Sequence, residues 1–337
     1  MDDNLNATYI TLAGFVELHK YRYLYFLVMF TVYILIICCN SVIICLIVIH
    51  RNLHEPMYIF IAALLLNSVL YSTNIYPKLS VDFLSEKQII TYPLCLFQAF
   101  IYYSLAGSEF LLLAAMSYDR YVSISKPLQH PTIMRKTTVI ILLVLAWTVP
   151  ACEVAACIVL YTDIKLCNFT LKGIFCNNSI YSLQCVRSVV VSVFGVFMLL
   201  NMALFPLLFI LFTYTRILII SYRSSKTVRR KAAQTCLPHL LVLINLSCLS
   251  SKTVRRKAAQ TCLPHLLVLI NFSCFITYDT ITVRLESDFP KVARFIMTLL
   301  IITYHPLFNP IIYGLKMKEI SKHLTRILNH IKFKKLY

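Results

Sequence analysis

The chain has 337 residues, of which 59 % are hydrophobic and only 14 % charged, and its formal net charge is +18. This composition excludes a soluble globular protein, and it excludes a nucleic-acid partner because the basic residues stand between apolar runs instead of forming a separate basic domain. Apolar runs of about 20 residues or more suit helices that cross about 30 Å of hydrocarbon. We therefore predict an all-α membrane protein whose helices form a bundle in the lipid bilayer.

Seven apolar runs, separated by polar residues, predict seven membrane-spanning helices within residues 23–314. The first run is too long for a signal-peptide core and lacks a small-residue cleavage site, so it is retained as a span. Placing residues 1–22 outside leaves most Lys and Arg residues in the cytoplasm, including those of a short helix and basic tail at 315–337. The predicted spans are about 23–49, 57–84, 95–119, 137–160, 188–220, 258–283 and 292–314.

The predicted outer side carries an acceptor motif for N-linked glycosylation, Asn6-Ala7-Thr8, whose use requires the lumenal side of the membrane. Four of the thirteen cysteines also lie on this side, in an oxidising compartment where pairing is favoured. Four cysteines allow three pairings, and the spacing alone leaves all three open. These cysteines are Cys95, Cys167, Cys176 and Cys185.

A near-identical repeat follows the fifth predicted span. Residues 224–248 recur at 250–274 with one difference, Leu246 against Phe272. The apolar part of the first copy is too short to cross a membrane, whereas the second continues to Val283. We therefore predict that the second copy forms the sixth span and that residues 224–249 are an extra cytoplasmic segment.

Several polar residues fall inside the predicted spans. Glu109 lies in the middle of the third, where an unpaired charge is costly, so we expect it to join a polar network. Asn40 and Asn67 are neutral groups that hydrogen-bond well between helices. Asp82 lies near an outer end, where we expect it to be solvated. No phosphate-binding loop, metal-ligand spacing or catalytic nucleophile motif occurs, so neither an enzyme, a cofactor nor a metal is predicted.

Two motifs end predicted spans: Asp119-Arg120-Tyr121 ends the third, and Asn309-Pro310-Ile311-Ile312-Tyr313 ends the seventh. With seven spans and an outside N-terminus, the chain resembles the rhodopsin-like G protein-coupled receptors over nearly its whole length. The stretches 53–58, 116–122 and 306–310 are similar to those of the odorant receptors, with details close to receptors of aquatic vertebrates.

The resemblance implies disulfides Cys95–Cys176 and Cys167–Cys185. It implies that Asp119 holds Arg120 at rest and releases it when the sixth span moves outward to admit a heterotrimeric G protein that raises cAMP. Such a receptor would stand in the plasma membrane of a sensory neuron and bind a small odorant. The residues implied for switching are Asp119, Arg120, Tyr121, Tyr214, Asn309, Pro310 and Tyr313. Those implied for the odorant are Tyr103, Gly107, Met198, Met202, Ser273, Thr277 and Ile302.

The chain also departs from the family pattern. Asn67 and Ser68 stand where the family usually has an acid, which argues against a sodium-type site shared with Glu109, and His305 stands where proline is common. The family has one copy of the repeated segment. Two alternatives therefore remain: a non-signalling product impaired by the duplication, and a small transporter, which lacks support because the repeat is local and direct instead of inverted.

Overall fold

The computed structural model describes residues 9–162, 165–186, 188–223, 290–317 and 319–326. Within these residues six helices are long and apolar enough to cross a membrane. They are α1 (Leu18–Ile49), α2 (Pro56–Leu84), α3 (Tyr92–Ser125), α5 (Lys136–Thr162), the continuous stretch α6 (Val189–Leu199), η3 (Leu200–Leu204) and α7 (Phe205–Arg223), and α11 (Lys291–Lys316).

The helix bounds follow the predicted spans closely, apart from two extensions into polar sequence. Helix α1 begins at Leu18, before the predicted start, and α3 continues past Asp119 to Ser125. Both extensions are possible because the backbone N–H and C=O groups of a helix pair with one another inside the segment, in lipid as well as in water. The predicted sixth span and the repeat lie outside the described residues.

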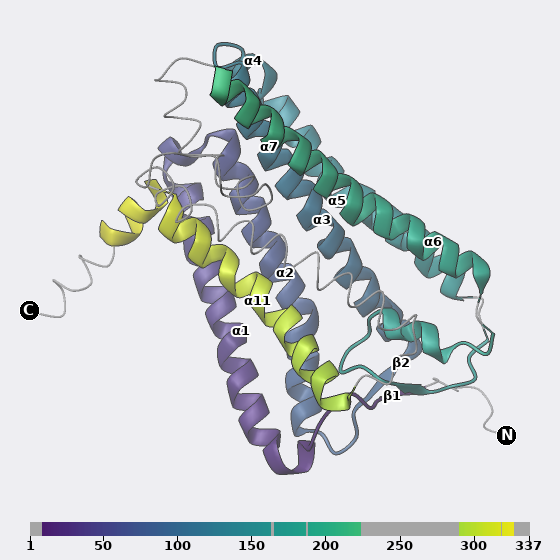
Figure 1. Cartoon of the computed structure of the whole chain (residues 1–337). Helices are drawn as coiled ribbons and strands as arrows, with labels where there is room; N and C mark the ends of the chain where they lie inside the picture. The colour runs from purple at the N-terminus through teal and green to yellow at the C-terminus, as the bar shows by residue number, and fades with distance from the viewer. Residues whose placement is uncertain (1–8, 163–164, 187, 224–289, 318, 327–337) are drawn as a thin grey trace, which may run out of the picture.

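The helices are arranged around α3, as Figure 1 shows. Helix α1 packs against α2 and α11, and α3 packs against α2, α5 and α7. Two buried apolar clusters fill the space between them. The outer cluster contains Tyr76 and Phe83, and the inner one contains Phe60 and Tyr313. Helix α3 contributes to both clusters, with Leu105 in the outer one and Leu112 in the inner one.

A small three-stranded sheet caps the outer end of the bundle, which hydropathy did not predict. Its order is β2 (Ile89–Thr91), β1 (Tyr9–Leu12), β3 (Thr170–Leu171). Strand β1 is antiparallel to β2 and parallel to β3. Ile10 and Leu12 are buried on the side facing the helices. The N-terminal segment is therefore part of the folded outer domain.

Two glycines let the backbone segments of this cap approach closely. The Gly14 N–H donates to the Gly173 carbonyl at 3.1 Å. A Cβ atom on Gly14 would lie 2.5 Å from the carbonyl carbon of Gly173, closer than side-chain carbons approach backbone. This crossing therefore requires a residue without a side chain at position 14.

The outer loop after α5 is fixed to the bundle by covalent and polar links. Cys95 of α3 is bonded to Cys176, and Cys167 to Cys185, which are the pairings that the family resemblance implies. The Cys176 N–H donates to Gln98 Oε1 at 3.0 Å, so α3 also orients the loop by hydrogen bonding. The short helix η2 (Asn178–Leu183) follows Cys176, and its Ile180 and Tyr181 side chains pack in the outer apolar cluster.

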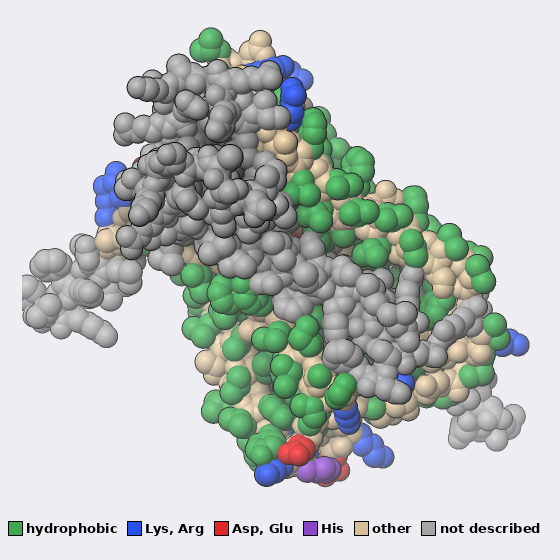
Figure 2. All heavy atoms as spheres, in the orientation of Figure 1, with side chains coloured by type: hydrophobic (Ala, Val, Ile, Leu, Met, Phe, Trp, Pro, Cys, Tyr) green, Lys and Arg blue, Asp and Glu red, His purple; other side chains and the backbone are tan. Residues whose placement is uncertain are grey.

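The sides of the bundle are apolar and exposed, as expected of a surface that faces lipid. Leu27 of α1, Ile140 of α5 and Phe212 of α7 are each more than half exposed. In Figure 2 hydrophobic side chains cover the flank, and Lys and Arg side chains gather toward the ends. The prediction that Asp82 is solvated is wrong. Asp82 is 1 % exposed and pairs with Lys78 one turn earlier, because the outer cap covers this end of α2.

Candidate functional site

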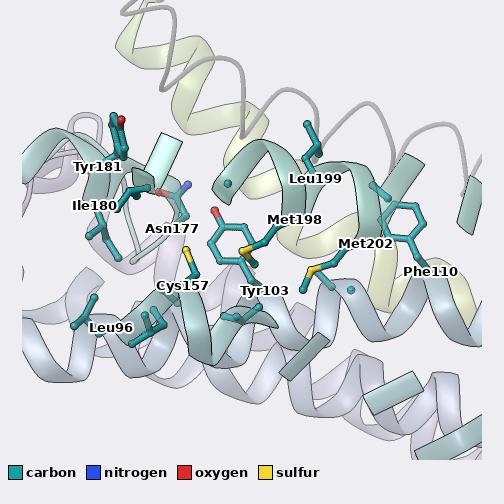
Figure 3. A pocket seen from close by; sticks show the side chains of 18 residues that line it. Leu96, Tyr103, Phe110, Cys157, Asn177, Ile180, Tyr181, Met198, Leu199 and Met202 are labelled. Atoms are coloured by element: carbon teal, nitrogen blue, oxygen red, sulfur yellow. The ribbon is translucent and has the colours of Figure 1, made fainter. Parts of the chain in front are cut away.

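A cavity of about 110 Å³ lies between α3, α5, α6 and η3, beneath η2 of the outer loop. Tyr103 projects into it from α3, and Met198 and Met202 enter from the opposite helix (Figure 3). The lining residues are Leu96, Ala99, Tyr103, Ala106, Gly107, Phe110, Val154, Cys157, Ile158, Asn177, Ile180, Tyr181, Val191, Gly195, Met198, Leu199, Met202 and Ala203.

Four of the residues expected to bind the odorant line this cavity: Tyr103, Gly107, Met198 and Met202. At Gly107, a Cβ atom would lie 2.8 Å from Cβ of Pro150 in α5 and 3.1 Å from the Met202 sulfur. Glycine at this position therefore lets α5 and η3 approach α3 at the cavity floor.

Ile302 does not line the cavity, contrary to the sequence expectation. It is fully buried in the outer core on α11, where its carbonyl lies 3.5 Å from the Tyr76 hydroxyl. The reason is that the outer end of α11 packs toward α1 and α2. Ser273 and Thr277 lie outside the described residues.

Among the described residues that line the cavity, the only ionisable side chains are the weakly acidic Tyr and Cys groups. Its polar groups come from Tyr103, Cys157, Asn177 and Tyr181. The Asn177 side-chain oxygen accepts from the Ser179 N–H at 3.1 Å, and the Tyr181 hydroxyl donates to the Ser188 carbonyl at 3.2 Å. An uncharged, largely apolar molecule suits such a lining, because it would leave no buried charge without a partner.

A polar cluster lies deeper in the bundle, where the sequence predicts a network around Glu109. Its carboxylate oxygen Oε2 lies 3.0 Å from Nδ1 of His305, and Oε1 accepts from the Asn309 side-chain amide at 3.0 Å. The same amide donates to the Ser68 hydroxyl at 3.0 Å. Three helices, α2, α3 and α11, therefore meet at one buried carboxylate.

Asn40 and Asn67 extend this polar region as links between helices. Asn40 donates to the carbonyls of Ile36 at 2.8 Å and Pro306 at 3.0 Å, which joins α1 to α11. Asn67 donates to the Leu105 carbonyl at 2.9 Å, joining α2 to α3. Both asparagines are fully buried, so these bonds replace those that water would otherwise provide.

The cytoplasmic end of α3 holds Asp119 between two basic side chains. Oδ2 of Asp119 lies 3.7 Å from Nη2 of Arg120, whereas Oδ1 lies 2.9 Å from Nε2 of His130 in the short helix α4 (His130–Ile133). Asp119 is 2 % exposed, and the two basic groups are about a quarter exposed. The nearer partner of Asp119 is therefore the histidine.

Comparison with known proteins agrees with this architecture. The family model described as 7 transmembrane receptor (rhodopsin family) matches residues 39–313. Olfactory receptor 11A1 of Homo sapiens is 30% identical over 328 residues, which cover 96% of this chain and 95% of the relative. Olfactory receptor 10AG1 of Homo sapiens is 31% identical over 325 residues, covering 94% and 97%. The chain belongs to the olfactory receptors of the rhodopsin family. It is a multi-pass plasma-membrane receptor and not an enzyme.

The remaining residues that the family resemblance implies for switching occupy different environments. Tyr313 is buried in the inner core, whereas Tyr121 and Tyr214 are partly exposed on α3 and α7. Pro310 lies inside α11 directly after Asn309, so the polar cluster and this proline are adjacent. The described residues thus connect the polar cluster to the cytoplasmic end through α3 and α11.

Sequence reasoning missed several residues of the receptor's sites. Asn177 and Tyr181 reach the cavity because the Cys95–Cys176 disulfide draws the outer loop over it, and no local pattern encodes that position. His305 was visible only as a departure from the family. The sequence gives little indication that His130 contacts Asp119, because His130 lies in a polar segment without helical periodicity, ten residues after Arg120.

Proposed function

We propose that this receptor binds a small, uncharged and mostly apolar odorant in the cavity between α3, α5 and α6, and in response activates a heterotrimeric G protein of the cAMP-raising olfactory type. The observation that carries the proposal is the lining of the cavity: it consists mostly of aliphatic, aromatic and sulfur-containing side chains, with Tyr103 at its centre. The similar human proteins are olfactory receptors, which supports the proposal.

The size of the cavity restricts the ligand further. Its volume of about 110 Å³ is below the range of about 300–1,000 Å³ that is usual for drug-sized ligands. A compact molecule with one hydroxyl, carbonyl or ester group fits both the volume and the few polar groups of the lining. Carboxylates and ammonium compounds are excluded by the cost of burying an unpaired charge.

Helix α3 provides the physical connection between the cavity and the cytoplasm. Tyr103 lines the cavity, Glu109 lies in the polar cluster, and Asp119 and Arg120 end the same helix. A ligand that fits one arrangement of the helices better than another shifts the population of receptors by its difference in affinity. We propose that the favoured arrangement frees Arg120 from Asp119 and opens the cytoplasmic face to the G protein.

The cavity is tested by its central aromatic residue. Cells that express the receptor are first screened with uncharged volatile alcohols, aldehydes and esters, and with carboxylate and ammonium counterparts, by a cAMP reporter. For an active compound, Tyr103→Ala should raise the half-maximal concentration by about tenfold or more, because it removes aromatic surface that contacts the ligand. Phe197→Ala, at a half-exposed position of α6 that does not line the cavity, is the matched control.

Two results would contradict this proposal. An unchanged dose response of Tyr103→Ala at normal surface level would remove the cavity as the binding site. A response to carboxylates but not to their neutral analogues would contradict the ligand class.

We further propose that residues 224–249 are an extra cytoplasmic segment and that 258–283 form the sixth span. An epitope inserted at Ser251 should be detectable only after permeabilisation, and its detection on intact cells would overturn this topology. Deletion of residues 224–249 should raise the signalling output if the segment obstructs the G protein. Unaltered output at equal surface level would dismiss the impaired-product alternative.

A further inference from the structure

The buried pair formed by Glu109 and His305 lies outside the cavity lining and away from the Asp119–Arg120 pair at the cytoplasmic end of α3. Its two side chains are 4 % and 5 % exposed, and Nδ1 of His305 lies 3.0 Å from Oε2 of Glu109. The partners come from α3 and α11, which lie on either side of α2 in the bundle. The pair therefore bridges two helices across the centre of the membrane-spanning core.

The Asn309 side chain presents a hydrogen-bond donor to the Glu109 carboxylate. The Asn309 amide donates a hydrogen bond to the other carboxylate oxygen, Oε1, at 3.0 Å. A hydrogen bond donated to a carboxylate stabilises the charged state, and a protonated oxygen at that position would lose it. The amide is fixed in this orientation because its second N–H donates to the Ser68 hydroxyl.

An ionised carboxylate at this depth requires a positive partner. Among the described residues, the other groups that approach the pair are neutral. Ser68 comes from α2, and Asn309 and Tyr313 come from α11. In the part of the chain that the structure describes, the His305 imidazole is the group beside Glu109 that can carry a positive charge, and its Nδ1 atom already lies at hydrogen-bonding distance.

We propose that the receptor core holds a proton on His305 as the built-in counter-ion of Glu109, and that this charged pair fixes α11 against α3 in the resting state. The imidazolium donates its Nδ1–H to Oε2 of Glu109, so the site is electrically neutral without a metal ion. In this state the His305 side chain, and not a bound cation, lies beside the carboxylate.

The proposal predicts a coupled effect of the two residues. His305→Asn leaves the carboxylate without a cation, and Glu109→Gln leaves the imidazolium without an anion. Each single variant should raise basal cAMP by about tenfold, since contacting residues of a charged pair are strongly coupled. The double variant Glu109→Gln with His305→Asn has no buried charge, and its basal cAMP should return to within about twofold of the wild type.

A second measurement distinguishes an internal cation from an ordinary packing contact. Sodium chloride is exchanged for choline chloride at constant ionic strength, and the melting temperature of the solubilised receptor is recorded. The wild type should not respond. His305→Asn should gain stability from sodium, because the Glu109 carboxylate, the Ser68 hydroxyl and the Asn309 side-chain oxygen remain available to a small cation.

The outcomes are decisive in both directions. A wild-type receptor whose melting temperature depends on sodium would overturn the proposal, as would a double variant that is no better than the worse single variant. If a single variant fails to reach the cell surface, the melting comparison is made on the solubilised protein. Because melting does not require ligand binding or G protein coupling, this proposal can fail or hold independently of the proposed function.

Discussion

Replacement of His130 by phenylalanine tests whether this histidine helps to hold the receptor at rest. The Nε2 to Oδ1 distance of 2.9 Å to Asp119 is a hydrogen-bond distance, whereas Arg120 is 3.7 Å away. A hydrogen bond to a charged group contributes about 1.5–3 kcal/mol. Because His130 is about a quarter exposed, we reduce this to about 1 kcal/mol. The ratio of active to resting receptors should then rise by about fivefold.

The assay is basal cAMP in cells without added odorant, divided by the surface level from an extracellular tag. His130→Phe should raise this ratio by about fivefold, while the maximal response to an active odorant changes less. His54→Phe is the matched control, because His54 is a cytoplasmic histidine whose ring contacts the Val48 carbonyl instead of Asp119. An unchanged ratio for His130→Phe, or an equal rise for His54→Phe, would refute the reasoning.

Three further predictions concern the outer cap, the cytoplasmic end and the centre of the bundle. Gly14→Val should remove most surface expression, since its Cβ would lie 2.5 Å from the Gly173 backbone; Gly14→Ala should be milder, and normal trafficking of both would contradict the cap. Residues 319–326 dock against the bundle through His323, whose ring centroid lies 3.9 Å from that of His50. Burial, and then the neighbouring His50, lower the pKa of His323 from 6.5, so the docked form binds fewer protons than the undocked form. Docking of residues 319–326 should therefore be complete above pH 6.5 and should weaken as the pH falls below 6.5 through the lowered pKa. Hydrogen exchange of these residues, corrected for intrinsic rates, measures the docking. Equal protection above and below this pH range would contradict the prediction. Asn40→Ala breaks two hydrogen bonds to carbonyls and should cost about 1 kcal/mol of thermal stability, whereas an unchanged melting temperature would show that these bonds add nothing.

Hydropathy predicted the six described spans well because lipid imposes a minimum length and an apolar surface on each one. The cap was missed for the opposite reason. Strands β1, β2 and β3 contain four, three and two residues, too few to show an alternating pattern. Their pairing depends on segments that are distant in the sequence.

Site residues could be predicted from the sequence where their place on a single helix decides their position. Tyr103 and Gly107 follow from their place on α3, whereas Asn177 reaches the cavity only through a disulfide-bonded loop. Similarly, Glu109 was recognisable as a costly charge, but its partner His305 is about 200 residues away along the chain, and only the packing of α11 beside the other helices brings it there. The duplicated segment remains a prediction.

The strand order of the outer cap also constrains the order in which the protein is completed during synthesis. Strand β1 emerges first, and β2 emerges before α3, but the parallel partner β3 follows α5. Thr11 must therefore wait for Thr170, its partner across the parallel pair, until four helices have been inserted and the outer loop has crossed the membrane. Contacts between such distant segments form slowly. The N-terminal strand is thus among the first parts of the receptor to be synthesised and among the last to pair. A completed cap can form only when the outer loop lies on the correct side of the membrane.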